Sequence, residues 1–165
     1  MTAHLLHQSH VGCNAFLGGI SKNYGTNLLL SDTSEYVVIE ADEFDRSFHW
    51  LSPYISVVTA TDADHLDIYG TKEAYLESFR HYTSLIRPGG ALIMRKGIEL
   101  QPDLQEGVQL YTYSKEEGDF HAENIRIGSG EIFFDYISPL GNIDDIQLGV
   151  PIAINIENGV AAMAL

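Results

Sequence analysis

Two short apolar runs that lack polar alternation constrain the fold of this chain most strongly. Residues 36–41 (YVVIEA) and 54–60 (YISVVTA) are rich in the β-branched and aromatic side chains that strands favour. A strand with one face in water alternates apolar and polar residues, whereas these runs are almost continuously apolar. Because that pattern is typical of strands covered on both faces, each run predicts a strand of a parallel sheet.

An amphipathic helix follows the second run. Apolar residues recur at three- and four-residue intervals within residues 72–86 (KEAYLESFRHYTSLI). Thr71 is a suitable N-cap, and the RPGG at 87–90 ends the helix before a third strand, ALIM at 91–94. The order of strand, crossover, strand, helix and strand indicates a doubly wound α/β unit.

Shorter elements flank this unit. Residues 2–8 predict a helix, and residues 14–20 (NAFLGGI) predict a strand that runs into a turn at Gly18 and Gly19. Residues 107–150 change to short alternating segments separated by polar or glycine-containing turns: VQLYTYS, FHAENIRIG and EIFFDYIS. These segments predict a small antiparallel sheet within the domain. The final NIENGVAAMAL has helical spacing.

The expected fold is therefore α/β, with a mostly parallel Rossmann-like sheet, flanking helices and a small appended antiparallel β-sheet. A length of 165 residues and 45% hydrophobic content are enough for one core. The 23 acidic and 9 scattered basic residues disfavour a nucleic-acid partner. Cys13, the single cysteine, fits a reducing compartment, and the apolar runs are far shorter than the roughly 20 residues that span a bilayer. We expect a cytoplasmic chain without a membrane partner.

Acidic residues follow the ends of both predicted parallel strands. Glu40 ends the first strand, and Asp64 and His65 follow the second within ATDADHLDIY. Ligands of open parallel sheets bind beyond the carboxyl ends of the strands, so Glu40 and His65 are expected on adjacent loops. Oxygen and imidazole ligands suit Mg²⁺ or Mn²⁺, with water and phosphate oxygens completing the coordination. Such acidic loops are also common as helix caps and solvated turns, and a lone histidine is more often a surface residue.

The sequence contains no phosphate-binding loop of the G-x-x-x-x-G-K-[ST] pattern. The nearest segment, GGISKNYGT, has the wrong spacing and no Lys-Ser or Lys-Thr pair. The spacing of Ser, Cys, His and Asp residues indicates no nucleophilic arrangement either. We therefore assign no catalytic residue from the sequence.

The order of four segments resembles the central domain of the Mur ligase family over nearly the whole chain. These segments are FLGGI, VVIEADEFDRSF, VVTATDADHLDIYGT and NIENGVAAMA. The resemblance implies a domain of a peptidoglycan-biosynthesis ligase that uses ATP to join L-alanine to UDP-N-acetylmuramic acid through an acyl phosphate. It also implies that Glu40 and His65 bind the metal ion and that Asn155 and, less directly, Asn158 contact the adenine nucleotide.

The remaining acidic residues receive supporting roles under this resemblance. A nucleotide-bound Mg²⁺ seldom takes more than one or two carboxylates from the protein. We therefore expect Asp42, Glu43 and Asp45 to hydrogen-bond the metal ligands from behind or to cap helices, and Asp64 to orient His65.

The chain departs from the family pattern at several points. Ala60 stands where the family usually has an asparagine, and Ile154 stands where many members have a histidine beside the nucleotide-binding asparagine. The family's Gly-Lys-Thr phosphate loop and its two flanking domains are expected outside residues 1–165. We therefore expect this chain by itself to show no ligase turnover and to bind ATP weakly or not at all.

Other functions stay open at the level of sequence. A metal-dependent phosphohydrolase built on Glu40, Asp64 and His65 is one, and a catalytically silent binding module is another. Within the ligases, a related muramoyl-peptide ligase or a ligase that adds a later stem residue is the nearest alternative.

Overall fold

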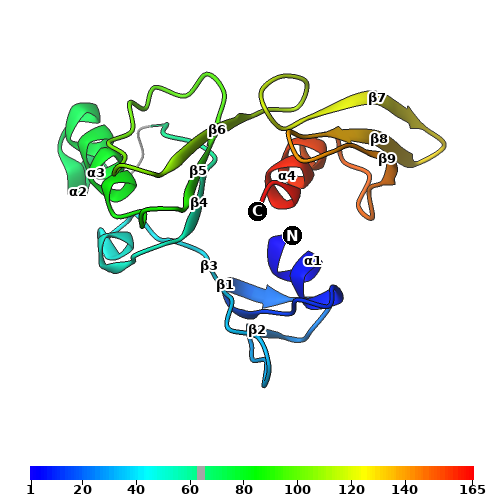
Figure 1. Cartoon of the computed structure of the whole chain (residues 1–165), viewed down its shortest axis with the longest axis horizontal. Coiled ribbons are helices and arrows are strands. Elements are labelled where there is room, and N and C mark those ends of the chain that lie inside the picture. Colours follow the sequence, from blue (N-terminus) through cyan, green and yellow to red (C-terminus); the bar gives the residue numbers. More distant parts are fainter. Residues whose placement is uncertain (63–65) are drawn as a thin grey trace. The chain divides into compact units, whose positions relative to one another are not determined.

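The computed structural model describes residues 1–62 and 66–165 and contains two compact units (Figure 1). Unit 1 is Met1–Asp42 and unit 2 is Glu43–Leu165. No helix in the described part of the chain is long and apolar enough to cross a bilayer.

Unit 1 is a three-stranded sheet, sheet A, with one helix. Its elements are α1 (Thr2–Gln8), β1 (Asn14–Ser21), β2 (Thr26–Leu29) and β3 (Val37–Ile39). The strand order is β2-β1-β3, with β1 antiparallel to β2 and parallel to β3. Ala3 of α1 is buried with Cys13, Ala15 and Leu29, so α1 packs against the sheet.

Two sequence predictions for unit 1 are wrong. Gly18 and Gly19 lie inside β1 rather than in a turn, and the chain turns later, where Gly25 has a φ of 66°. The first apolar run forms a strand that pairs in parallel, β3 with β1, but the predicted burial of both faces is wrong, since Val37 and Ile39 are 51% and 47% exposed. β3 pairs only with β1 among the described strands, and unit 1 packs α1 against one face of this sheet.

Unit 2 begins with a parallel sheet that contains two of the predicted parallel strands, residues 54–60 and 91–94. Sheet B has the order β4-β5-β6, and all of its pairs are parallel. Its strands are β4 (Ile55–Val58), β5 (Ala91–Arg95) and β6 (Gln109–Tyr113). Leu92 and Ile93, which are adjacent in β5, belong to two different buried clusters. Successive side chains of a strand point to opposite faces, so both faces of this sheet are covered.

Helix α3 (Lys72–Ser84) covers one face of sheet B, as predicted. Its Tyr75, Phe79 and Tyr82 are buried in one cluster with Leu92. Thr71 caps the helix, because its Oγ1 accepts a hydrogen bond from the backbone N–H of Ala74 at 3.1 Å. The short helix α2 (Leu66–Tyr69) and the 3₁₀ helix η1 (Ser47–Trp50) pack beside α3.

The assignment of VQLYTYS to the antiparallel sheet is wrong, because β6 pairs in parallel with β5. Parallel strands need a long crossover, which is usually a helix. Here residues 96–108 form the crossover without a helix, and Leu100 and Leu104 pack it onto the cluster beneath α3. The missing helix and the alternation of a partly exposed edge strand explain the error.

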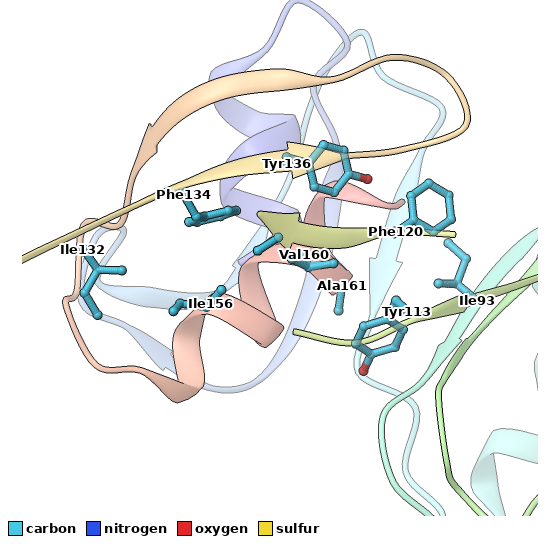
Figure 2. Packing of buried hydrophobic residues seen from close by; sticks show 10 residues of the cluster. Ile93, Tyr113, Phe120, Ile132, Phe134, Tyr136, Ile156, Val160 and Ala161 are labelled. Atoms are coloured by element: carbon cyan, nitrogen blue, oxygen red, sulfur yellow. The ribbon is translucent and has the colours of Figure 1, made fainter. Parts of the chain in front are cut away.

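Sheet C is antiparallel, with the order β7-β8-β9, and it packs on the last helix. Its strands are β7 (His121–Gly128), β8 (Glu131–Ile137) and β9 (Ile143–Gln147), of which β9 is not among the predicted segments. Figure 2 shows Ile156 and Val160 of α4 (Ile154–Met163) beside Phe134 of β8. Ile93 and Tyr113 of sheet B belong to the same cluster, so α4 joins the two sheets.

Gly90 allows β5 to start against β4, and we predict that Gly90→Ala destabilises the chain. A Cβ at Gly90 would lie 1.9 Å from the carbonyl oxygen of Tyr54. The backbone must move to relieve that clash, so the free energy of unfolding should fall by about 3 kcal/mol, the upper end of overpacking penalties.

Urea denaturation followed by circular dichroism measures this change. Gly149→Ala is the matched control, since a Cβ there meets nothing within 4 Å. It should change the unfolding free energy by less than about 0.5 kcal/mol. Equal stability of the two variants would contradict this description of the β4–β5 contact.

Candidate functional site

The carboxylate of Glu40 is fixed at the end of β3. Its Oε2 accepts a hydrogen bond from the backbone N–H of Gly18 in β1 at 2.9 Å. Its own backbone N–H donates to the carbonyl oxygen of Phe16 at 3.2 Å. A Cβ at Gly18 would lie 2.8 Å from Oε1 of Glu40, whereas a Cβ at Gly19 would meet nothing within 4 Å. The first glycine of the pair therefore makes room for the carboxylate.

The donor set near Glu40 fits a hard cation that keeps most of its water. Glu40 is exposed, and within residues 1–62 and 66–165 no three His, Cys, Asp or Glu side chains gather closely enough to hold a metal ion. Mg²⁺ in nucleotide sites commonly takes one or two carboxylates, with water and phosphate oxygens as its other ligands. A single positioned carboxylate fits that pattern and does not fit a cage built from protein ligands alone.

The acidic residues after Glu40 differ in their surroundings. Oδ1 of Asp45 accepts a hydrogen bond from the backbone N–H of Ser47 at 2.9 Å, at the start of η1. Hydrogen bonds from Ser47 hold the pKa of Asp45 below its usual value. The N-cap residue of η1 is Arg46 and no described side chain caps this helix, so the capping role of Asp45 stays a prediction. Asp42 is exposed and Glu43 is half-buried in the segment between β3 and η1.

Residues 43–50 are anchored to helices α2 and α3. The hydroxyl of Tyr69 donates a hydrogen bond to the carbonyl oxygen of Glu43, and the guanidinium carbon of Arg46 lies 4.9 Å from the centroid of the Tyr69 ring. Nε2 of His49 lies 3.0 Å from the carbonyl oxygen of Ser78 in α3. Polar contacts therefore fix the segment that follows the acidic loop.

A polar cluster lies at the carboxyl ends of β5 and β6. Arg95 ends β5, and Tyr113 lies opposite it in β6. Nε of Arg95 donates to Oε1 of Glu157 in α4 at 3.0 Å, and this contact raises the pKa of Arg95. Burial, together with the charge of Glu157, raises the pKa of Tyr113 to about 12. Asp62, which follows β4, adds a negative charge that raises the pKa of Arg95 further.

Asn155 and Asn158 form a linked pair in the first turns of α4. Nδ2 of Asn155 donates to the carbonyl oxygen of Val150 at 3.2 Å, and Nδ2 of Asn158 donates to Oδ1 of Asn155 at 3.3 Å. Asn158 is exposed and Asn155 is half-buried, whereas Ile156 and Val160 are buried in the cluster of Figure 2. The two amides therefore lie on a different face of α4 from its packed side chains.

A family model described as Mur ligase middle domain matches residues 1–165, the whole of the sequence. The chain belongs to this Mur ligase family. The α/β architecture with parallel sheet B and antiparallel sheet C agrees with that membership and confirms the predicted fold class.

Similar proteins carry the name UDP-N-acetylmuramate–L-alanine ligase. The chain is 90% identical over 165 residues to the one from Phocaeicola vulgatus and 66% identical over 166 aligned residues to the one from Parabacteroides distasonis. Both matches cover 100% of this chain and 36% of the relative. The chain thus spans about a third of the length of the curated relatives that it matches.

Solved Mur ligase structures have the same fold. UDP-N-acetylmuramate-alanine ligase from Thermotoga maritima superposes with a TM-score of 0.79 at 24% identity, covering 99% of this chain and 36% of that one. A ligase for a muramoyl peptide, UDP-N-acetylmuramate:L-alanyl-gamma-D-glutamyl-meso-diaminopimelate ligase from Neisseria meningitides, gives a TM-score of 0.78 at 19% identity, covering 99% and 55%. At these identities the likeness supports the fold alone.

The predicted site residues of this Mur ligase domain are distributed over two units. Glu40 lies in unit 1, and Asn155 and Asn158 lie in unit 2. Asp64 and His65 lie outside the described residues, so their roles stay predictions. No backbone pairing joins β3 to β4 in the described sheets, and the adjacency of the two acidic loops therefore stays a prediction too.

Sequence reasoning missed the polar contacts of Arg95, Glu157 and Tyr69. The sequence contains a hint of each member of the Arg95–Glu157 pair. A charged residue ends the apolar strand ALIMR, and a carboxylate lies in the first turn of the helix that begins with INIEN. Neither feature predicts that the two residues pair, because they are 62 positions apart in the sequence.

The contacts of His49 predict a pH dependence of stability. Burial lowers the pKa of His49 and outweighs the hydrogen bond with Ser78, which raises it, while the nearby charges of His81 and Arg46 lower it slightly. The folded state therefore disfavours the protonated imidazole, and the unfolded chain takes up more protons. The contribution of neutral His49 to the free energy of unfolding should be fully present above the unfolded pKa of about 6.5. It should be lost as the pH falls toward the lower folded pKa.

Urea denaturation of wild type and His49→Gln between pH 7.5 and 5.0 measures this effect. The wild-type free energy of unfolding should decrease over that range more steeply than that of the variant. Identical pH slopes for the two proteins would contradict the proposed effect of burial at His49.

Proposed function

We propose that this chain is the nucleotide-handling middle of an ATP-dependent ligase that joins L-alanine to UDP-N-acetylmuramic acid in peptidoglycan synthesis. The observation that carries this proposal is the 90% identity over all 165 residues to the UDP-N-acetylmuramate–L-alanine ligase of Phocaeicola vulgatus. The reaction belongs to the complete protein, since the chain spans 36% of that relative. It consumes ATP, and we place it in the cytoplasm.

The chemistry requires charge neutralisation more than covalent help from the protein. The γ-phosphoryl group of ATP passes to the lactyl carboxylate of the sugar nucleotide, which gives an acyl phosphate and ADP. The amino group of L-alanine then attacks the acyl carbon, and inorganic phosphate leaves as the amide bond forms. Both steps bring anionic oxygens together, so preorganised positive charge is the main source of rate acceleration.

The residues of this chain fit the binding of a metal ion and a nucleotide. A bound Mg²⁺ or Mn²⁺ would supply the charge that the phosphate oxygens need. Glu40 would hold it, with His65 as a second ligand and Asp42 and Asp64 hydrogen-bonding these ligands. The hydrogen bond from Gly18 leaves Oε1 of Glu40 as the oxygen not engaged in that contact.

The amide groups of α4 suit an adenine nucleotide. Each amide offers both donors and an acceptor, which the edges of a purine and a ribose require. The hydrogen bond between Asn155 and Asn158 restricts the rotamers of both side chains. It therefore lowers the entropy that these side chains lose when a ligand binds. We propose that both residues contact ATP.

The alternative functions differ in what must be added to the reaction. A metal-dependent phosphohydrolase would release phosphate with water as the acceptor, and a related muramoyl-peptide ligase would use a different acceptor. Identity over the full chain favours the alanine ligase, whereas the structural likeness to muramoyl-peptide ligases supports only the common fold.

ADP formation by the complete protein tests the proposal. We expect ADP to form over many turnovers only when ATP, UDP-N-acetylmuramic acid and L-alanine are all present, because without L-alanine the reaction stops at the acyl phosphate. Glu40→Gln should lower this rate by about 100-fold and raise the Mg²⁺ concentration needed for half-maximal rate, because the carboxylate charge is lost.

Three outcomes would contradict the proposal. Phosphate release that is independent of L-alanine would favour the hydrolase, and an unchanged Mg²⁺ dependence in Glu40→Gln would exclude the assigned metal ligand. The 165-residue chain by itself is expected to form no ADP, and alanine-dependent ADP formation by that chain would contradict its assignment as one part of the ligase.

The two glycines of β1 provide a matched pair of variants in the complete protein. In Gly18→Ala the new methyl group would clash with the Glu40 carboxylate, so the Mg²⁺ concentration for half-maximal rate should rise about 10-fold. Gly19→Ala should leave that concentration unchanged, because a Cβ there contacts nothing within 4 Å. Equal Mg²⁺ dependence of the two variants would show that the close approach of Gly18 does not position the carboxylate.

A further inference from the structure

A charged pair joins the end of β5 to the first turn of α4. Nε of Arg95 lies 3.0 Å from Oε1 of Glu157, and the side chains are 41% and 14% exposed. The largely buried Glu157 carboxylate needs a partner to replace its lost hydration. Removing one member of such a pair therefore destabilises a protein more than removing a fully exposed ion pair does. The pair therefore holds the beginning of α4 at a defined point of sheet B.

The hydrophobic contacts of α4 do not by themselves set that point. Ile156 and Val160 are fully buried in the shared cluster of Figure 2, but apolar burial is non-directional. The helix start also has no side-chain cap, since its N-cap residue is Ala153. A directional contact is needed to fix the rotation of this first turn, and the guanidinium–carboxylate bond supplies one.

Glu157 lies between the two asparagines in the sequence. Rotation of the first turn of α4 would therefore move the amides of Asn155 and Asn158 together with the Glu157 carboxylate. The buried Tyr113, opposite Arg95 in the β5–β6 pair, lies close enough for the charge of Glu157 to raise its pKa. The hydrogen bond from Arg95, the last residue of β5, thus places Glu157 beside the carboxyl end of a parallel strand, where ligands of such sheets bind.

We propose that Arg95 is a positioning residue for the adenine nucleotide. By holding Glu157, it fixes the rotation of α4 and so the positions of the Asn155 and Asn158 amides. This inference rests on the proposed function, because it takes the two asparagines to be nucleotide contacts. Arg95 itself does not contact the nucleotide in this proposal.

The test uses steady-state kinetics of the complete ligase. Arg95→Met keeps much of the side-chain volume but removes the charge, so the KM for ATP should rise about 10-fold through misplaced contacts. The kcat and the KM for L-alanine should stay within about 2-fold, because the proposal confines the displacement to the nucleotide contacts. Arg95→Lys, which keeps the charge without the planar fork, should give a smaller increase of about 3-fold.

A double-mutant cycle separates the pair from its two members. If Arg95 acts through Glu157, the double variant Arg95→Met/Glu157→Met should raise the KM for ATP no further than Arg95→Met does. Additive increases would overturn the inference. Glu157→Gln, which keeps an acceptor oxygen, should retain more ATP affinity than Glu157→Met.

Arg126→Met is the matched control for removal of a paired arginine. Arg126 pairs with Asp145 at 2.6 Å, and its side-chain contacts are with Asp135, Asp145 and the Phe133 ring of sheet C rather than with α4. Its removal should leave the KM for ATP unchanged. Urea denaturation without nucleotide is measured for every variant, and an Arg95→Met that is less stable but keeps the wild-type KM for ATP would show a purely structural pair.

Asn155→Ala distinguishes failure of this inference from failure of the proposed function. If Asn155→Ala raises the KM for ATP and the Arg95→Lys and Arg95→Met variants fold but do not raise it, the positioning role of Arg95 is wrong. The assignment of Asn155 to the nucleotide then stands. If Asn155→Ala leaves the KM for ATP unchanged, the nucleotide assignment itself is wrong. Increases in both Asn155→Ala and Arg95→Met, with wild-type behaviour of Arg126→Met, are the expected result.

Discussion

The hydrophobic cluster that α4 shares with two sheets is the interaction on which the rest of unit 2 depends. Ile93 and Tyr113 enter it from sheet B, Phe134 from sheet C, and Val160 from α4. This burial brings α4 to the parallel sheet, although the three strands of sheet C lie between β6 and α4 in the sequence. The polar contacts then add direction, since Arg95 fixes a helix that apolar packing alone leaves free to rotate.

Under the proposed metal-binding role of Glu40, electrostatics explains why a strand of an acidic chain ends in this residue. A carboxylate at the carboxyl end of a parallel strand suits a cation beside a phosphate, and a protein of net charge −14 gains no general attraction for phosphate. Local geometry must therefore supply the affinity. In this proposal Gly18 contributes by holding the Glu40 carboxylate in place, because it donates its N–H to a carboxylate that a Cβ at this position would clash with.

Local sequence patterns predicted the elements whose packing is local. β4, α3 and the Thr71 cap follow from apolar periodicity and capping chemistry, and the structure has all three. β6 was misassigned because its crossover lacks a helix, and Gly18 was assigned to a turn because its use depends on a residue 22 positions away. Pairings such as that of Arg95 depend on tertiary structure and have no local signature.

Anomalous scattering from Mn²⁺ in crystals of the complete ligase with a non-hydrolysable ATP analogue tests the central claim most directly. We predict a Mn²⁺ peak within about 2.3 Å of a Glu40 carboxylate oxygen. We also predict the adenine nucleotide in contact with Asn155 or Asn158. A nucleotide bound without contact to α4, or a Mn²⁺ ion that Glu40 does not ligate, would contradict the account.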